Sequence, residues 1–178
     1  MDSSSSYTLT TFQNEDVPKD VVEAMAEIGY EEYPHLEKAY HQETAEEDIN
    51  RVKNGKSVLI IARDINTDDI VAYASLDNTR TQTQAELGKG IVRKEHRRRG
   101  IYESLVKARE KIAREMGFES LIVHPANDGN SERVLRRLGF VTLREDEIGQ
   151  VDLIKFLNVS SKEQEHVPTE SNEPGIRQ

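Results

Sequence analysis

The sequence predicts a single domain of mixed α/β (α+β) class, with about six to seven strands and about four helices. The length of 178 residues suits one domain. Apolar segments of strand type alternate with segments of helical spacing, and three strands follow one another without a helix, which excludes a doubly wound sheet. We expect the domain to span 7–159, between a flexible N-terminus at 1–6 and a disordered tail at 160–178.

The first half of the chain is expected to contain one strand, two helices and a hairpin. Tyr7–Phe12 is rich in β-branched and aromatic residues, which is typical of a strand. Apolar residues recur at helical spacing between Pro18 and Gly29, which predicts a helix. An acidic helical region with an expected break, and then two strands joined by a polar turn, lie in order at 34–53, 57–64 and 70–76.

The second half is expected to alternate strands and helices. A strand at 86–92 contains Gly88 and Gly90, and glycine inside a strand often marks a bulge or a close backbone approach. Tyr102–Met116 has an apolar stripe at helical spacing and is followed by a glycine cap. We expect Asn130 and Ser131 to cap the last helix. The remaining elements lie at 121–123 (strand), 131–138 (helix), 141–144 and 151–159 (strands).

Composition excludes several classes of protein. Lysine and arginine total 24 against 33 acidic residues, a net charge of −9, which argues against a general nucleic-acid binder. The absence of cysteine excludes a disulfide scaffold, a cysteine nucleophile and thiolate metal sites. No apolar run is long enough to span a membrane, and the polar N-terminus lacks the features of a secretory signal. We therefore expect a cytoplasmic protein.

The net charge is the sum of two opposed segments. Residues 1–50 contain 13 acidic and 2 basic side chains, whereas residues 89–114 contain 10 basic and 3 acidic ones. The basic segment could attract a polyanion and the acidic segment a cation.

The basic segment contains a candidate phosphate site. A strand ends near Val92, a loop with Arg97, Arg98 and Arg99 follows, and a helix begins at about Gly100. The first N–H groups of a helix lack internal partners and bind anions, and glycine lets a phosphate approach the backbone. The pattern is neither a Walker A loop nor a dinucleotide fingerprint. A solvated charge run and a nucleic-acid surface are the alternative interpretations.

Two blocks carry a resemblance to a known family. Arg97-Arg98-Arg99-Gly100-Ile101-Tyr102 resembles the acetyl-CoA loop of the GNAT N-acetyltransferase superfamily, which reads R/Q-x-x-G-x-G/A between the fourth strand and the third helix. Asp128–Phe140 resembles the family's N-x-x-S/A helix that ends in Gly-Phe. The resemblance covers 57–157 and implies a GNAT-like, mostly antiparallel sheet that splays between the fourth and fifth strands. It also implies transfer of the acetyl group of acetyl-CoA to a primary amine through a ternary complex.

The resemblance implies which residues bind acetyl-CoA. Backbone groups at the end of the fourth strand would pair with the pantetheine arm, and these belong to Ile91, Val92 and Arg93. Backbone N–H groups of the loop would hold the pyrophosphate, and these belong to Arg97, Arg98, Arg99, Gly100, Ile101 and Tyr102. The family's asparagine corresponds to Asn127 when counted from the strand before it and to Asp128 when counted back from Gly139-Phe140.

Glu86 is the candidate general base, because it opens the strand on which several family members carry a catalytic glutamate. The alternative is a solvated glutamate at a strand start. His124 could be a base or a structural residue, and Tyr30 and Tyr33 could line the acceptor site or pack internally. Many family members protonate the departing thiolate with a tyrosine at the position of Leu135, so the general acid is unassigned.

The expected partners are acetyl-CoA, as the acyl-donor cosubstrate, and an amine acceptor that is a cationic small molecule or a protein amine. We expect no nucleic acid, no membrane and no metal, since His35 and His41 lack partners at metal-ligand spacing. Tyr102 stands where the family has a small residue. Together with Leu135 it motivates an alternative, a CoA-binding sensor or interaction module without acyl transfer. The sequence leaves monomer and homodimer open.

Overall fold

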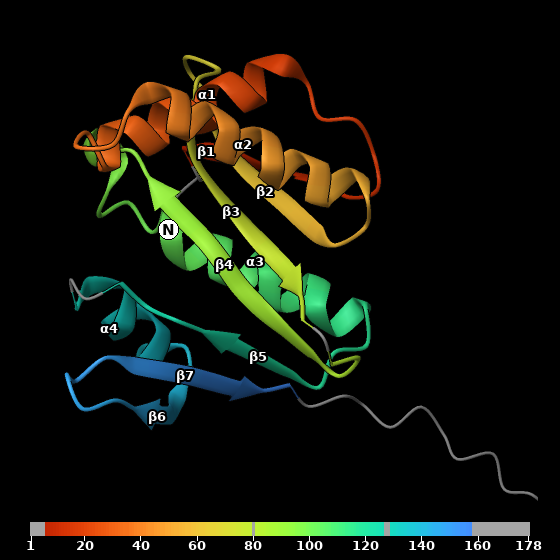
Figure 1. Cartoon of the computed structure of the whole chain (residues 1–178), viewed down its shortest axis with the longest axis vertical. Helices are drawn as coiled ribbons and strands as arrows, with labels where there is room; N and C mark the ends of the chain where they lie inside the picture. The colour runs from red at the N-terminus through yellow and green to blue at the C-terminus, as the bar shows by residue number, and fades with distance from the viewer. Residues whose placement is uncertain (1–5, 80, 127–128, 158–178) are drawn as a thin grey trace, which may run out of the picture.

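A computed structural model of the chain describes residues 6–79, 81–126 and 129–157. These residues form one seven-stranded sheet in the order β1-β2-β3-β4-β5-β7-β6, together with four α-helices and a short 3-10 helix η1 (Figure 1). The strands are β1 (Tyr7–Phe12), β2 (Ser57–Asp64), β3 (Ile70–Asn78), β4 (Gln84–Val92), β5 (Ser120–Val123), β6 (Val141–Glu145) and β7 (Val151–Phe156). The helices are α1 (Lys19–Glu32), α2 (Lys38–Lys53), η1 (Lys94–His96), α3 (Ile101–Glu115) and α4 (Asn130–Arg137).

The sheet is antiparallel except where β4 meets β5. These two strands run parallel and pair only over residues 84–87 and 120–123. β5 then ends, whereas β4 continues to Val92 beside β3 alone. The two strands diverge from this point (Figure 1). The expected mixed fold and its splay between the fourth and fifth strands are thus confirmed.

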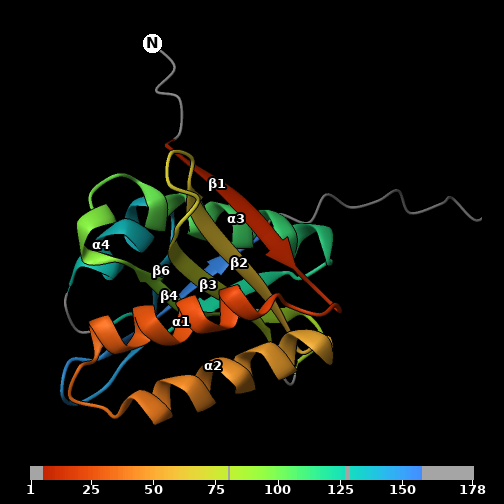
Figure 2. The ribbon, with the colours of Figure 1, turned by 90° about the horizontal axis from the view of Figure 1, so that it is seen from above.

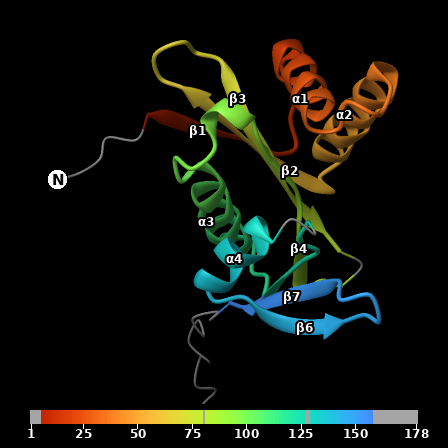
Figure 3. The ribbon, with the colours of Figure 1, turned by 90° about the vertical axis from the view of Figure 1, so that its left-hand side faces the viewer.

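The helices form one layer on each face of the sheet. α1 and α2 cover one face, and α3 and α4 cover the other (Figures 2 and 3). Alternate residues of β2 therefore enter different cores: Leu59 and Ile61 pack beneath α1 and α2, whereas Ile60 and Ala62 pack beneath α3. Burial on both faces explains why this strand is a continuous apolar run rather than an alternating one.

Two local expectations are wrong. α2 is unbroken, because His41, Ala45, Ile49 and Val52 recur on one buried face that holds the helix against the sheet despite its acidic composition. The N-cap of α4 is Gly129 in a left-handed conformation, not Asn130 or Ser131.

The ends of the chain fall mostly outside the described part. The expected flexible N-terminus at 1–6 overlaps the described residues only at Ser6. The expected tail at 160–178 lies wholly outside them, as do the last two residues of the domain expected over 7–159.

Candidate active site

A cleft with a volume of about 960 Å³ opens where β4 leaves β5. Both helical layers and the centre of the sheet contribute to its walls. On one side the lining includes Tyr33 from the connection between α1 and α2, and His41, Glu47, Asp48 and Arg51 from α2. The sheet contributes Tyr73, Ser75 and Asp77 from β3, Glu86–Ile91 from β4, and Val123–Ala126 at and beyond the end of β5. On the other side α3 contributes Tyr102.

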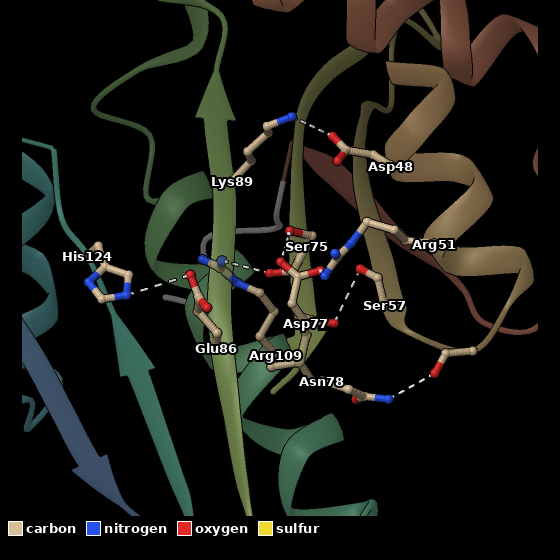
Figure 4. A network of polar contacts seen from close by, with 12 residues as sticks. Asp48, Arg51, Ser57, Ser75, Asp77, Asn78, Glu86, Lys89, Arg109 and His124 are labelled. Atoms are coloured by element: carbon tan, nitrogen blue, oxygen red, sulfur yellow. Dashed lines mark hydrogen bonds and ion pairs between the residues drawn. The ribbon is translucent and has the colours of Figure 1, made fainter. Parts of the chain in front are cut away.

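Glu86 and His124 face each other across the parallel pair of strands. Glu86 lies on β4 opposite Ile122, and His124 is the first residue after β5. Glu86 Oε1 lies 3.8 Å from His124 Nε2, and both side chains are about two-fifths exposed to the cleft (Figure 4). The structure therefore brings together the two residues that the sequence offered separately as a base.

The other ring nitrogen of His124 is held from β7. Its Nδ1 lies 2.5 Å from Asp152 Oδ1, and Asp152 also accepts a hydrogen bond from Arg144 Nε. The side chain of Asp152 is only 9% exposed. Burial acts to raise the pKa of this carboxyl, but the hydrogen bonds and charges of His124 and Arg144 outweigh it and hold the pKa below its usual value.

Two further ion pairs cross the cleft toward α2. Lys89 Nζ lies 2.7 Å from Asp48 Oδ2, and Arg51 Nη2 lies 3.0 Å from Asp77 Oδ1 (Figure 4). Asp77 also accepts a hydrogen bond of 3.1 Å from the Ser75 hydroxyl. These ion pairs connect α2 to β4 through Lys89 and to β3 through Asp77.

The glycines of β4 make room for side chains from β3 and α3. A Cβ on Gly88 would lie 2.1 Å from Asp77 Oδ2 and 2.2 Å from Ser75 Oγ. A Cβ on Gly90 would lie 3.1 Å from the Tyr102 ring and 3.3 Å from Arg109 Nη2. The register of β3 and β4 shifts between the pairs Leu76–Leu87 and Ala74–Gly90, so the bulge expected at these glycines is confirmed, and the groups that approach them closely are side chains.

Arg109 is a buried cation behind this part of β4. It is 1% exposed, and its guanidinium donates to the carbonyls of Ser75 (3.2 Å) and Gly88 (3.4 Å) and bonds the Tyr102 hydroxyl. Burial lowers the pKa of Arg109 to about 10, although Tyr102 and Asp77 act to raise it. The guanidinium thus stays charged at neutral pH beneath the cleft.

The arginines of the basic loop fall into two groups. Arg97 donates from Nε to the Val92 carbonyl at 2.9 Å and pairs with Glu32 of α1. Arg93 pairs with two further glutamates of α1, Glu27 and Glu31. Arg98 and Arg99, by contrast, form no ion pair within the described part of the chain; both are exposed, and Arg98 has a positive φ of 64°.

The loop leads into the N-terminus of α3. Gly100 is the N-cap, with φ 77° and with no atom within 4 Å of the position a Cβ would take. Ile101 is 2% exposed, so its side chain belongs to the core and only its backbone can face a ligand. Asn127 and Asp128 lie outside the described residues.

Other candidate residues are separated by the fold. Tyr33 lines the cleft, whereas Tyr30 packs its ring against His41 at 6.0 Å between centroids. Leu135 is fully buried in the core under α3 and α4. Among the described residues, no group of three potential ligands could hold a metal ion, and no helix is long and apolar enough to cross a membrane.

Sequence reasoning missed Asp152 and Arg109. The sequence contained a signal for both residues, because each is a charged side chain at a position where its neighbours are apolar. Asp152 stands between Val151 and Leu153 of a strand, and Arg109 lies on the apolar stripe of α3. A charge at such a position is retained only where partners satisfy it.

Comparison with known proteins identifies the family. The sequence pattern of the acetyltransferase (GNAT) family matches residues 21–140, about two thirds of the chain. The chain belongs to this family. A search of curated proteins finds no match.

Solved structures of GNAT acetyltransferases share the fold. Aminoglycoside 6'-acetyltransferase type Ii superposes with a TM-score of 0.67 at 17% identity, over 84% of this chain and 96% of that one. An aminoglycoside 6'-N-acetyltransferase complexed with coenzyme A gives a TM-score of 0.69 at 14% identity, over 84% and 96%. The PaiA N-acetyltransferase from Thermoplasma acidophilum, also in complex with coenzyme A, gives 0.61 at 15% identity, over 85% and 99%.

Proposed function

We propose that this GNAT protein is an N-acetyltransferase that transfers the acetyl group of acetyl-CoA to a primary amine within a ternary complex. The observation that carries the proposal is the cleft at the divergence of β4 and β5. Its lining runs from Tyr102 at the start of α3, along the free edge of β4, to Glu86.

The proposed cofactor site fits acetyl-CoA at its phosphate end. The N–H groups at the start of α3 and the bare backbone of Gly100 suit a pyrophosphate, and the exposed Arg98 and Arg99 add positive charge. Arg97 is paired with Glu32, so its contribution is to fix the loop by bonding Val92.

The edge of β4 suits the pantetheine arm. The N–H of Arg93 donates to Val71 of β3, so this residue is turned away from the gap. Backbone groups of an antiparallel strand alternate in direction, which turns Gly90 and Val92 toward the gap. An extended amide chain could add to this edge as a further strand would.

Glu86 is the proposed group that receives the amine. Acyl transfer requires a neutral nitrogen, so an ammonium substrate must lose a proton before it attacks. A carboxylate in the cleft both attracts an ammonium and can accept its proton, directly or through water.

The charge of the cleft favours a cationic acceptor. Its charged lining residues other than histidine are four carboxylates, Glu47, Asp48, Asp77 and Glu86, against the two cations Arg51 and Lys89. The net negative charge would attract an amine with more than one positive group. Aminoglycosides, named as the acceptors of two similar structures, are of this class.

Thermal unfolding with acetyl-CoA, followed by thiol release with a panel of amines, tests the proposal. The panel includes a polyamine, an amino sugar, free lysine and a peptide with a free N-terminus. We expect acetyl-CoA to raise the melting temperature and at least one cationic amine to release CoA. Stabilisation by acetyl-CoA with no thiol release from any amine would instead establish the CoA-binding module. Absence of both effects would refute the cofactor site.

Replacement of Glu86 tests its role. Glu86→Gln keeps the shape but loses the charge and the basicity, so turnover should fall about 100-fold, the lower end for a general base. Stabilisation by acetyl-CoA should be unchanged. Glu115→Gln, at the exposed far end of α3, is the matched control and should keep wild-type turnover. Wild-type turnover in Glu86→Gln would eliminate this residue as the base.

A further inference from the structure

His124 is held in the cleft in one defined orientation. Its Nδ1 lies 2.5 Å from Asp152 Oδ1, and the other oxygen of Asp152 is bonded by Arg144. Asp152 is kept ionised, as the direction of its pKa shows, so it acts as an acceptor. The proton of a neutral His124 ring therefore resides on Nδ1, and Nε2 presents a lone pair to the cleft.

This lone pair lies beside the carboxylate of Glu86. Nε2 and Oε1 are 3.8 Å apart, which is beyond a hydrogen bond and places two acceptors side by side (Figure 4). A substrate nitrogen at about 2.9 Å from both Nε2 and Oε1 would donate a hydrogen bond to each of these two atoms. An ammonium group carries enough hydrogens for such a pair of contacts, so the two side chains form a site for it.

We propose that His124 is a second catalytic residue, which takes the proton that the acceptor ammonium must lose while Glu86 holds the ammonium by its charge. This inference deepens the proposed function and rests on it. Within that reaction it moves the proton acceptance, proposed above for Glu86, to His124, and it leaves Glu86 the task of attracting the ammonium by its charge.

The proton balance of the step is complete. An N–H bond of the ammonium breaks, the proton moves to Nε2, and the electron pair stays on nitrogen to attack the thioester carbon. The C–S bond then breaks, and the sulfur takes the second nitrogen proton to leave as the thiol. The imidazolium returns its proton to water, which the 42% exposed side chain of His124 can reach.

The charged groups around His124 fit this role. Within the described part of the chain, the charged groups that face the ring are Glu86 of β4 and Asp152 of β7, and Arg144 of β6 pairs with Asp152 from behind. From α4, the cleft lining contains the uncharged Ser131. Asp152 stabilises the imidazolium as it forms. A second proton on Nε2 would be donated to Glu86 and would leave no acceptor for the ammonium proton, so the step requires the neutral ring.

His124→Asn is the variant that separates catalysis from structure. The asparagine amide can occupy the place of Nδ1 and donate to Asp152, but no atom replaces Nε2. With the best alkylamine of the panel, kcat/KM should fall about 100-fold or more. With hydroxylamine, which is largely neutral at pH 8, the loss should be less than about tenfold, because no base is needed. His96→Asn is the control, since His96 also faces a carboxylate, Asp64 at 3.9 Å, but does not line the cleft.

Asp152→Asn gives a second, independent readout. Its amide would donate to Nδ1 and force the ring proton onto Nε2, so kcat/KM with the alkylamine should fall at least tenfold while acetyl-CoA still raises the melting temperature.

Each outcome decides the proposal. Wild-type kcat/KM in a folded His124→Asn, or equal losses with alkylamine and hydroxylamine, would overturn the role of His124 and leave the proposed function intact. A wild-type protein that acetylates no amine would refute both.

Discussion

The sharpest test of the cofactor site compares two glycines at opposite ends of α3. Gly100 precedes the helix with φ 77°, and Gly117 follows it with φ 83°. At both positions a Cβ would meet no atom within 4 Å. Alanine at either one therefore adds backbone strain without a clash, and only Gly100 lies at the proposed phosphate site.

The stabilities of the two alanine variants should differ from each other only when acetyl-CoA is present. Left-handed strain should cost each variant about 1 kcal/mol of stability, or about 2–4 °C in melting temperature. At Gly100 the methyl group would also separate the pyrophosphate from the backbone. Loss of one charge-assisted hydrogen bond, about 1.5–3 kcal/mol, corresponds to a tenfold to hundredfold rise in the acetyl-CoA Kd.

Thermal unfolding with and without acetyl-CoA measures both effects. At 100 times the wild-type Kd, the ligand should stabilise wild type and Gly117→Ala by about 2.7 kcal/mol, and Gly100→Ala by about 0.4–1.4 kcal/mol. Equal stabilisation of the two variants would refute the reasoning. An unequal loss of stability without ligand would show that strain at the two positions is not matched.

Three further perturbations probe the fold around the cleft. Gly88→Ala should destabilise the protein by about 1–3 kcal/mol in urea unfolding, because its Cβ would lie 2.1 and 2.2 Å from two side-chain oxygens of β3; an unchanged midpoint would show that these side chains swing away at no cost. Leu135→Ala, at a fully buried position, should cost about 2–5 kcal/mol in the same assay, and a loss below 1 kcal/mol would contradict its place in the core. The pKa of Asp152 is lowered in the folded state, so its contribution to stability is present above about pH 4 and disappears as pH falls through the folded value. Asp152→Asn should thus lower the melting temperature at pH 7 much more than at pH 3, and equal losses would contradict the stabilising role of its bonds to His124 and Arg144.

The sequence predicted the order of the elements because most of them are defined by local patterns. The apolar run Ser57–Asp64 and the apolar stripe of α3 needed no knowledge of distant residues. Glycines also carried local information: Gly88 and Gly90 marked a bulge, and Gly100 marked the start of a helix. α2 was misjudged because its polar composition hid a buried face that only contact with the sheet makes stable.

The site was predicted only as far as it is contiguous in sequence. The basic loop could be recognised because its residues are neighbours in the chain. The contact between Glu86 and His124 depends on the parallel register of β4 and β5, and the contact between His124 and Asp152 depends on the pairing of β5 with β7. Register is set by packing across the whole sheet, so no local pattern could have joined these three residues.

The charge asymmetry of the sequence changes its meaning once the chain is folded. α1 has no basic residue in its last turn, yet it ends in Glu31 and Glu32, where the negative end of the helix dipole disfavours carboxylates. Arg93 and Arg97 pair with these residues, so part of the basic segment neutralises part of the acidic one. The same pairs connect the helix that borders the proposed acceptor site to the loop of the proposed cofactor site. The positive charge left for a phosphate is therefore smaller than the sequence count suggests, and the backbone at the start of α3 must supply more of the binding.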